Sequence, residues 1–216
     1  MLDARVRAAM SPVTERAGAR LAAAGVRPLA LTGTAWLAGV GACIAAGAGA
    51  WHLALVLWLA NRVLDGLDGA VARAVGVTER GGFLDLMADF SIYAGFVVGV
   101  AVAVPSARLA CLVLLSTYYV SGAAFLALSS LLERRRHRFG DERSLRFVGG
   151  LAEGTETAIA YVLFTVFPQQ AATIAWVFAA AVAVTAVQRI FFGVRVLAEP
   201  VPTDAEPARA LAVHPE

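Results

Sequence analysis

Long apolar stretches occupy most of this chain and limit what it can fold into. Hydrophobic residues make up 59% of its 216 residues and charged residues 16%, and the mean hydropathy is +0.72, which is far from the balance of a water-soluble domain. The stretches are rich in alanine and leucine and lack the alternation that is typical of β-strands. The composition therefore predicts an all-α membrane protein.

Six transmembrane helices are expected, each of about the length that crosses a bilayer core of about 30 Å. Their approximate ranges are 29–49, 51–73, 83–104, 107–132, 151–167 and 170–197. The fifth is the shortest and carries Glu153 and Glu156 in its first turns. A chain of this length suffices for one helical unit, so residues 29–197 are expected to form a single transmembrane domain.

The segments on either side of this domain have a different composition. In residues 1–28, Ser11 and Pro12 predict a helix start and Gly25 predicts its end, which gives an amphipathic juxtamembrane helix on the cytoplasmic side. This segment has no continuous apolar core, which argues against a cleaved signal peptide. The four prolines and scattered charges of residues 198–216 predict a disordered cytoplasmic tail.

The arginines predict how the helices are oriented, since the chain has no lysine. The connections around residues 49–51, 105–108 and 168–170 contain Arg108 alone, and the other arginines lie in or near the remaining connections and the two end segments. By the positive-inside rule, both termini and the connection after the second helix are cytoplasmic. The expected location is a bacterial cytoplasmic membrane.

Four aspartates interrupt the second and third apolar stretches at helical intervals. Asp65 and Asp68 are three residues apart, and Asp85 and Asp89 are four apart, so each pair shares one face of a helix. Placing a carboxylate next to hydrocarbon costs free energy, so an acid within a transmembrane helix is a candidate functional residue. If the two helices face each other, four carboxylates surround one small space. Such a space suits divalent cations, which prefer hard oxygen ligands, and has room for two of them about 3.5–4 Å apart.

The pattern around these aspartates resembles the signature of the CDP-alcohol phosphatidyltransferase family, D-x2-D-G-x2-A-R-x8-G-x3-D-x3-D. Every fixed position has a match, and the matching residues are Asp65, Asp68, Gly69, Ala72, Arg73, Gly81, Asp85 and Asp89. One departure is visible, because seven residues rather than eight separate Arg73 from Gly81. The shortening falls in an expected turn and concerns the loop rather than the acids.

The resemblance implies an enzyme that transfers a phosphatidyl group from CDP-diacylglycerol, or a similar CDP-lipid, to a small alcohol, with release of CMP, in phospholipid biosynthesis. It implies Mg²⁺ or Mn²⁺ as cofactor, with two ions held by Asp65, Asp68, Asp85 and Asp89. Asp89 is also expected to be the general base, as the acid least committed to the ions. The residues expected around the CDP moiety are Gly69, Ala72, Arg73 and Gly81. Asn61 and Arg62, one turn before Asp65, are weaker candidates for orienting the acids or the phosphate.

The alcohol acceptor stays open, with glycerol 3-phosphate and inositol phosphate as candidates. A phosphorylated acceptor would call for an arginine that faces the aspartates, and the candidates are Arg134, Arg138, Arg143, Arg146 and Arg189. An uncharged or zwitterionic acceptor would direct attention to Glu153 and Glu156. Membrane lipids are expected partners, a homodimer is what the resemblance suggests, and no nucleic acid is expected.

Two other classes of function compete with a transferase. An intramembrane cation-binding or transport protein also uses acids in its helices, but it has no need of the Gly and Ala-Arg positions. A non-catalytic lipid-binding relic would tolerate the loss of an aspartate, whereas all four are present. Metal-dependent release of CMP distinguishes the enzyme from both.

Overall fold

The computed structural model describes residues 2–139 and 154–198, which form helices joined by short turns. This confirms the all-α class for the described part of the chain. The elements in chain order are α1 (Leu2–Ala23), α2 (Pro28–Gly47), α3 (Trp51–Val75), α4 (Glu79–Ala103), η1 (Pro105–Ala107), α5 (Arg108–Phe139), α6 (Gly154–Val166), η2 (Pro168–Gln170) and α7 (Ala171–Ala198).

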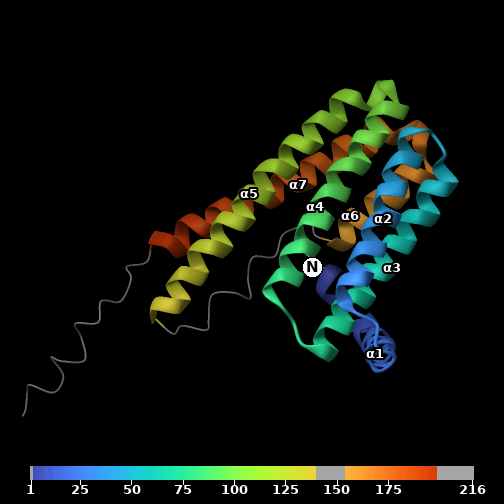
Figure 1. The fold of residues 1–216 in the computed structure, drawn as a ribbon. Coiled ribbons are helices and arrows are strands. Elements are labelled where there is room, and N and C mark those ends of the chain that lie inside the picture. Colours follow the sequence, from blue (N-terminus) through green and yellow to red (C-terminus); the bar gives the residue numbers. More distant parts are fainter. Residues whose placement is uncertain (1, 140–153, 199–216) are drawn as a thin grey trace, which may run out of the picture.

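The long helices form two groups that α6 connects (Figure 1). Helices α2, α3 and α4 pack against one another as a bundle, and α5 and α7 lie side by side as a pair. Helix α6 contacts both α3 and α7. The short turns after α2, α4 and α6 gather at one end of the molecule, while the α3–α4 connection lies at the other end, next to α1. The motif aspartates, on the last turns of α3 and the first turns of α4, belong to this second end.

Very close helix contacts hold the α2–α3–α4 bundle together. A Cβ atom on Gly99 of α4 would lie 2.6 Å from the carbonyl oxygen of Cys43 on α2, so this crossing requires glycine. On α2, a Cβ atom on Gly39 would lie 2.8 Å from the Ile92 side chain and 3.0 Å from the Asn61 amide nitrogen. Such close approach is usual among transmembrane helices, which associate through small residues and van der Waals packing.

An aromatic cluster fills the region where α3, α4 and α6 meet. Trp58, Phe96, Tyr161 and Phe164 are fully buried, and the rings of Phe96 and Tyr161 stack with their centroids 4.6 Å apart. Their polar atoms are satisfied by backbone carbonyls: Trp58 Nε1 donates to Ala158 O at 3.3 Å, and the Tyr161 hydroxyl donates to a carbonyl of α4 at 2.6 Å. Burial of this kind costs little, because the polar atoms keep their hydrogen bonds.

All six helices expected within residues 29–197 are present near their expected positions, but four qualify as membrane spans by length and composition. Among the described residues these four spans are Pro28–Gly47, Glu79–Ala103, Pro105–Arg134 and Pro168–Ala198. Helix α6 has 13 residues, which corresponds to about 20 Å of rise. Helix α3 is long enough, but its charged residues around the motif lower its hydropathy.

The N-terminal helix differs from the expectation in where it starts. The predicted start at Ser11 and Pro12 is wrong, because α1 begins at Leu2 and contains Pro12 in its interior. The helix-forming alanines and arginines before Pro12 outweigh the one backbone hydrogen bond that proline removes. The predicted end is confirmed: Gly25 has a φ of 79° just after the last residue of α1.

Helix α1 packs on the bundle through a small residue. A Cβ atom on Gly18 would lie 2.6 Å from the Ala70 side chain of α3. The expected tail, residues 198–216, falls outside the described residues except for Ala198, which ends α7.

Candidate functional site

A connection of three residues, Gly76–Thr78, brings the two halves of the aspartate motif together. Gly76 follows α3 with a φ of 111°, in a region that favours glycine. Thr78 begins α4 as its N-cap, because its hydroxyl accepts a hydrogen bond from the backbone N–H of Gly81 at 3.1 Å. The shortened motif spacer is thus absorbed in a turn, and both helices keep their register.

The acids of α3 and α4 come close enough to interact. Asp65 has electrostatic interactions with Asp89, Asp85 and Asp68. Asp68 is the most buried of the four, at 5% exposed. The structure therefore places the four aspartates in one region, on the adjoining parts of α3 and α4.

The donor chemistry of this cluster fits a hard divalent cation. Carboxylates repel one another, and oxygen atoms from two helices are the ligands that Mg²⁺ and Mn²⁺ prefer. Within residues 2–139 and 154–198, however, no three acidic, histidine or cysteine side chains are gathered closely enough to form a ready metal site. The assignment of Asp65, Asp68, Asp85 and Asp89 as metal ligands stays a prediction.

Thr32 is a member of the site that the sequence did not reveal. It lies on α2, and its hydroxyl donates to Asp68 Oδ2. Both side chains are buried, with Thr32 8% and Asp68 5% exposed. The two residues are 36 positions apart, so only the packing of α2 on α3 brings them into contact.

Arg62, one of the weaker candidates from the sequence, is also a member of the site, and its ion pairs tie the two acidic helices together. Its Nη2 atom lies 2.8 Å from Asp89 Oδ1, and its Nη1 atom lies 3.6 Å from Asp65 Oδ2. Sequence analysis placed Arg62 one turn before Asp65 but could not show which helix it would face.

The residues expected around the CDP moiety lie at the adjoining ends of α3 and α4. Gly69, Ala72 and Arg73 occupy the last turns of α3, and the Arg73 side chain is exposed. A Cβ atom on Gly69 would lie 3.3 Å from the Arg73 guanidinium. A Cβ atom on Gly81 would lie 2.9 Å from the Thr78 hydroxyl, so one observed reason for glycine at this position is the cap of α4. Their contacts with CDP stay predictions.

Comparison with known proteins decides the family. A family model described as CDP-alcohol phosphatidyltransferase matches residues 26–188. The chain belongs to the CDP-alcohol phosphatidyltransferase family. This confirms the resemblance and the class of enzyme inferred from the aspartate motif.

Two known proteins are similar to this chain. The inner membrane protein YnjF of Escherichia coli (strain K12) is 36% identical over 198 residues, which cover 89% of this chain and 95% of that protein. The crystal structure of Mycobacterium tuberculosis phosphatidylinositol phosphate synthase (PgsA1) with CDP-DAG bound has the same fold, with a TM-score of 0.68 and 21% identity. That match covers 84% of this chain and 94% of the synthase chain.

The arginines considered for a phosphorylated acceptor are placed only in part. In the transferase, Arg189 donates from Nη1 to Ser121 O at 3.2 Å and to Ser121 Oγ at 2.9 Å, and its guanidinium lies 5.2 Å from the centroid of the Phe125 ring. These contacts place it between α5 and α7. Arg134 is exposed near the end of α5. The other arginine candidates, namely the side chain of Arg138 and the residues Arg143 and Arg146, fall outside the described part of the chain. Glu153, considered for an uncharged or zwitterionic acceptor, falls outside it as well.

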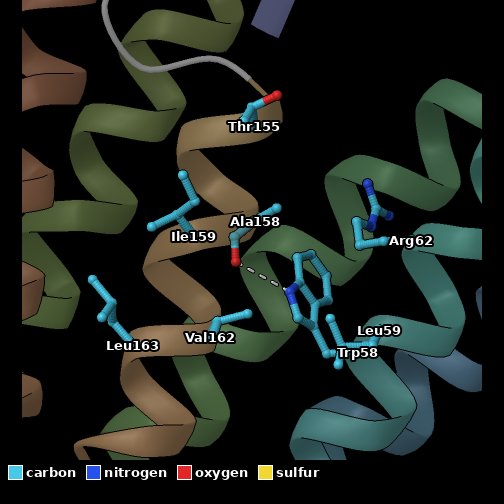
Figure 2. A pocket seen from close by; sticks show the side chains of 8 residues that line it. All are labelled: Trp58, Leu59, Arg62, Thr155, Ala158, Ile159, Val162 and Leu163. Atoms are coloured by element: carbon cyan, nitrogen blue, oxygen red, sulfur yellow. Dashed lines mark hydrogen bonds between the residues drawn. The ribbon is translucent and has the colours of Figure 1, made fainter. Parts of the chain in front are cut away.

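A groove of about 310 Å³ runs between α3 and α6, and Arg62 is one of its lining residues (Figure 2). Trp58 and Arg62 of α3 lie on one side, and the side chains of α6 lie on the other. Apart from Arg62 and a threonine, the lining is apolar; its residues are Trp58, Leu59, Arg62, Thr155, Ala158, Ile159, Val162 and Leu163. The groove therefore offers hydrocarbon-like walls that reach the charged site at Arg62.

Proposed function

We propose that this transferase moves a phosphatidyl group from CDP-diacylglycerol to a small alcohol and releases CMP. The observation that carries the proposal is the convergence of Asp65, Asp68, Asp85 and Asp89 at the adjoining ends of α3 and α4, with every other fixed position of the family motif in place. The family match supports phosphatidyl transfer in phospholipid synthesis. The Mycobacterium tuberculosis synthase, which shares the fold, was crystallised with CDP-DAG bound, and this supports a CDP-lipid as donor.

In the proposed reaction, the acceptor hydroxyl attacks the phosphorus that carries diacylglycerol. A new P–O bond forms to the acceptor, the bond from this phosphorus to the bridging oxygen breaks, and that oxygen leaves with CMP. Asp89 takes the hydroxyl proton as general base. Asp65, Asp68 and Asp85, with Asp89 partly shared, would hold two Mg²⁺ or Mn²⁺ ions, which screen the diphosphate and polarise the phosphorus when bound.

The CDP moiety of the donor would be surrounded by Gly69, Ala72, Arg73 and Gly81. The exposed guanidinium of Arg73 offers a permanent charge and a planar fork that suit phosphate oxygens. The groove between α3 and α6 would hold the lipid tails and lead them toward the bilayer, because Arg62 lines it and most of its other lining side chains are apolar.

The proposed membrane arrangement has six spans, with both termini and the aspartates on the cytoplasmic side of a bacterial cytoplasmic membrane. The distribution of arginine supports it, and so does the similarity to an inner membrane protein. Helix α1 would lie along the cytoplasmic leaflet as a juxtamembrane helix. A homodimer through lipid-facing helices belongs to the same proposal.

For the acceptor we propose a phosphorylated alcohol, and glycerol 3-phosphate and inositol phosphate are the first compounds to test. Arg73 and Arg80 are exposed in the last turn of α3 and the first turn of α4, the two helices that carry the aspartates. An exposed guanidinium group beside the site can pair with the phosphate of such an acceptor.

The test is a reaction of the purified protein in lipid nanodiscs with labelled CDP-diacylglycerol and a panel of alcohols. The panel contains glycerol 3-phosphate, inositol phosphate, inositol, glycerol and serine, with Mg²⁺, Mn²⁺ or a chelator. We expect CMP release that requires metal and one labelled lipid product. Uptake of divalent cations into proteoliposomes of the same protein, without CMP release, would support a transport protein instead.

The ligand assignment is tested in the same assay with Asp65→Asn, Asp68→Asn and Asp85→Asn. A neutral amide is a poor ligand for a hard divalent cation, so turnover should be lost in each variant. Glu79→Gln, at an exposed position in the first turn of α4, is the matched control and should keep its activity. Retention of more than about a tenth of the wild-type rate, which corresponds to about 1.4 kcal/mol of barrier, contradicts the role of that aspartate.

A further inference from the structure

Arg62 is a charged residue inside an apolar region, on α3 one turn before Asp65. Its side chain is 18% exposed. An arginine among transmembrane helices is costly unless its charge is compensated by partners. The contacts of its guanidinium therefore indicate why the position is charged.

Each nitrogen of the Arg62 guanidinium has a partner. Nη2 donates to Asp89 Oδ1 at 2.8 Å, and Nη1 donates to the Tyr93 hydroxyl at 3.0 Å while lying 3.6 Å from Asp65 Oδ2. Nε donates to Asn61 Oδ1 at 2.8 Å. The guanidinium thus bridges Asp65 of α3 and Asp89 of α4, with the shorter contact to Asp89.

Aromatic rings fix the plane of the same group. The central carbon of the guanidinium lies 4.7 Å from the centroid of the Trp58 ring and 5.3 Å from that of Tyr93. Cation–π contacts of this length add to the ion pairs and restrict rotation of the side chain. Trp58 is itself held by its hydrogen bond to Ala158 on α6.

Asn61 connects this arrangement to α2. The residue is 3% exposed, and its Nδ2 atom donates to Ala35 O at 2.8 Å. Because the amide nitrogen is used in this way, the amide oxygen faces Arg62 and accepts from Nε. Gly39 lets α2 come this close, since a Cβ atom there would lie 3.0 Å from the Asn61 amide nitrogen.

We propose that Arg62 is a positioning residue that fixes the Asp89 carboxylate as proton acceptor and keeps one of its two oxygens from binding a cation; this rests on the function proposed above. The guanidinium of Arg62 binds Oδ1 of Asp89. Only the other carboxylate oxygen would then be able to bind a cation. The positive charge between Asp65 and Asp89 also reduces the repulsion within the acidic cluster. The motif of the family does not include this position.

Two other roles for Arg62 predict different measurements. An arginine that binds the donor's diphosphate would change the KM for CDP-diacylglycerol when it is replaced. An arginine that only stabilises the fold would lower thermal stability and would not strengthen cation binding. A positioning residue changes kcat, leaves the KM for the CDP-lipid nearly unchanged, and alters the electrostatics of the cation-binding acids.

The experiment compares Arg62→Gln, Arg62→Lys and the control Arg195→Gln, an exposed position in the last turn of α7. It measures kcat, the KM for CDP-diacylglycerol, the thermal midpoint, and Mn²⁺ affinity without CDP-lipid from the electron paramagnetic resonance signal of free Mn²⁺. For Arg62→Gln we expect kcat to fall roughly 10- to 100-fold, the loss that a misplaced catalytic group produces. We also expect Mn²⁺ to bind roughly threefold or more tightly, because one positive charge near the acids is gone.

Arg62→Lys separates charge from geometry. Lysine keeps the charge but lacks the planar fork that reaches several partners together. We therefore expect near-wild-type Mn²⁺ affinity with turnover that stays low. The control should match the wild-type protein in all four measurements.

Three results would overturn the proposal. These are an Arg62→Gln turnover within about threefold of wild type, a raised KM for the CDP-lipid at unchanged kcat, and weaker rather than tighter Mn²⁺ binding. If Arg62→Gln does not fold, Tyr93→Phe decides: we expect a loss of turnover of about 2- to 12-fold, the range for one neutral hydrogen bond, and unchanged turnover refutes the role. Absence of metal-dependent CMP release from the wild-type protein would instead refute the proposed function, and the Mn²⁺ titration would still test Arg62.

Discussion

The hydrogen bond between Thr32 and Asp68 offers a sharp test of how the site is organised. The Thr32 hydroxyl, on α2, donates to Asp68 Oδ2 and also lies 3.2 Å from the Pro28 carbonyl oxygen. Thr32→Val keeps the branched shape of the side chain and removes the donor. The variant therefore leaves a carboxylate that is 5% exposed with one hydrogen bond fewer.

The size of the effect follows from the charge on the acceptor. A hydrogen bond to a charged group contributes about 1.5–3 kcal/mol, and such energies correspond to factors of about 10 to 150. If Thr32 holds Asp68 in the orientation that the reaction needs, turnover of Thr32→Val should fall by at least about tenfold.

The assay is metal-dependent CMP release in nanodiscs, with the thermal midpoint measured in parallel. Thr34→Val is the matched control: Thr34 lies on the same helix, is exposed, and donates only to its own helix, at Ala30 O and Leu31 O. We expect the control to keep full turnover. Equal turnover in the two variants, with both proteins folded, would show that the bond to Asp68 does not organise the site.

Three further predictions address the base, the bundle and the topology. Asp89→Asn should lower kcat by about 10²–10⁴-fold with CDP-lipid binding nearly intact; a parallel loss of binding would make it mainly a ligand. Gly99→Ala should destabilise the protein by about 1–3 kcal/mol, because its Cβ would lie 2.6 Å from a carbonyl oxygen of α2, whereas Gly33→Ala, with no neighbour within 4 Å, should not lower the thermal midpoint. A cysteine at Arg134 should react with impermeant reagents only from the cytoplasm and one at Ser106 only from outside, and the opposite pattern would invert the proposed topology.

Much of the fold could be predicted because it depends on local properties of the chain. Apolar stretches bounded by glycine and proline located α2 to α7 to within a few residues, except that α5 continues to Phe139, seven residues beyond its expected end. Helical spacing placed the acids of α3 and α4 on shared faces. The start of α1 was wrong because Pro12 was treated as a helix start, whereas the chain before it also forms helix. Whether a helix crosses a membrane depends on charge and length together, which explains the difference between six expected spans and four that qualify by composition.

The partners of the acids could not be predicted, because they depend on how helices rotate against one another. Thr32 lies 36 residues from Asp68, and Arg62 lies 27 residues from Asp89. Neither belongs to the family motif, and a threonine or arginine in a helix has several possible faces. A signal was nevertheless present: Arg62 is a charge within an otherwise apolar stretch, and such a charge requires a partner.

The glycines at the helix crossings have a consequence for how this chain can diverge. Gly18, Gly39 and Gly99 stand where a Cβ atom would come within 2.6–2.8 Å of a neighbouring helix, so the shape of the backbone, rather than any chemistry of the side chain, restricts these positions. Lipid-facing positions carry no comparable restriction, since one apolar residue there can replace another. Mutational drift should therefore concentrate on the outer surface and spare the crossings, which would let a chain with 21% identity to a bacterial synthase keep a fold that superposes with a TM-score of 0.68.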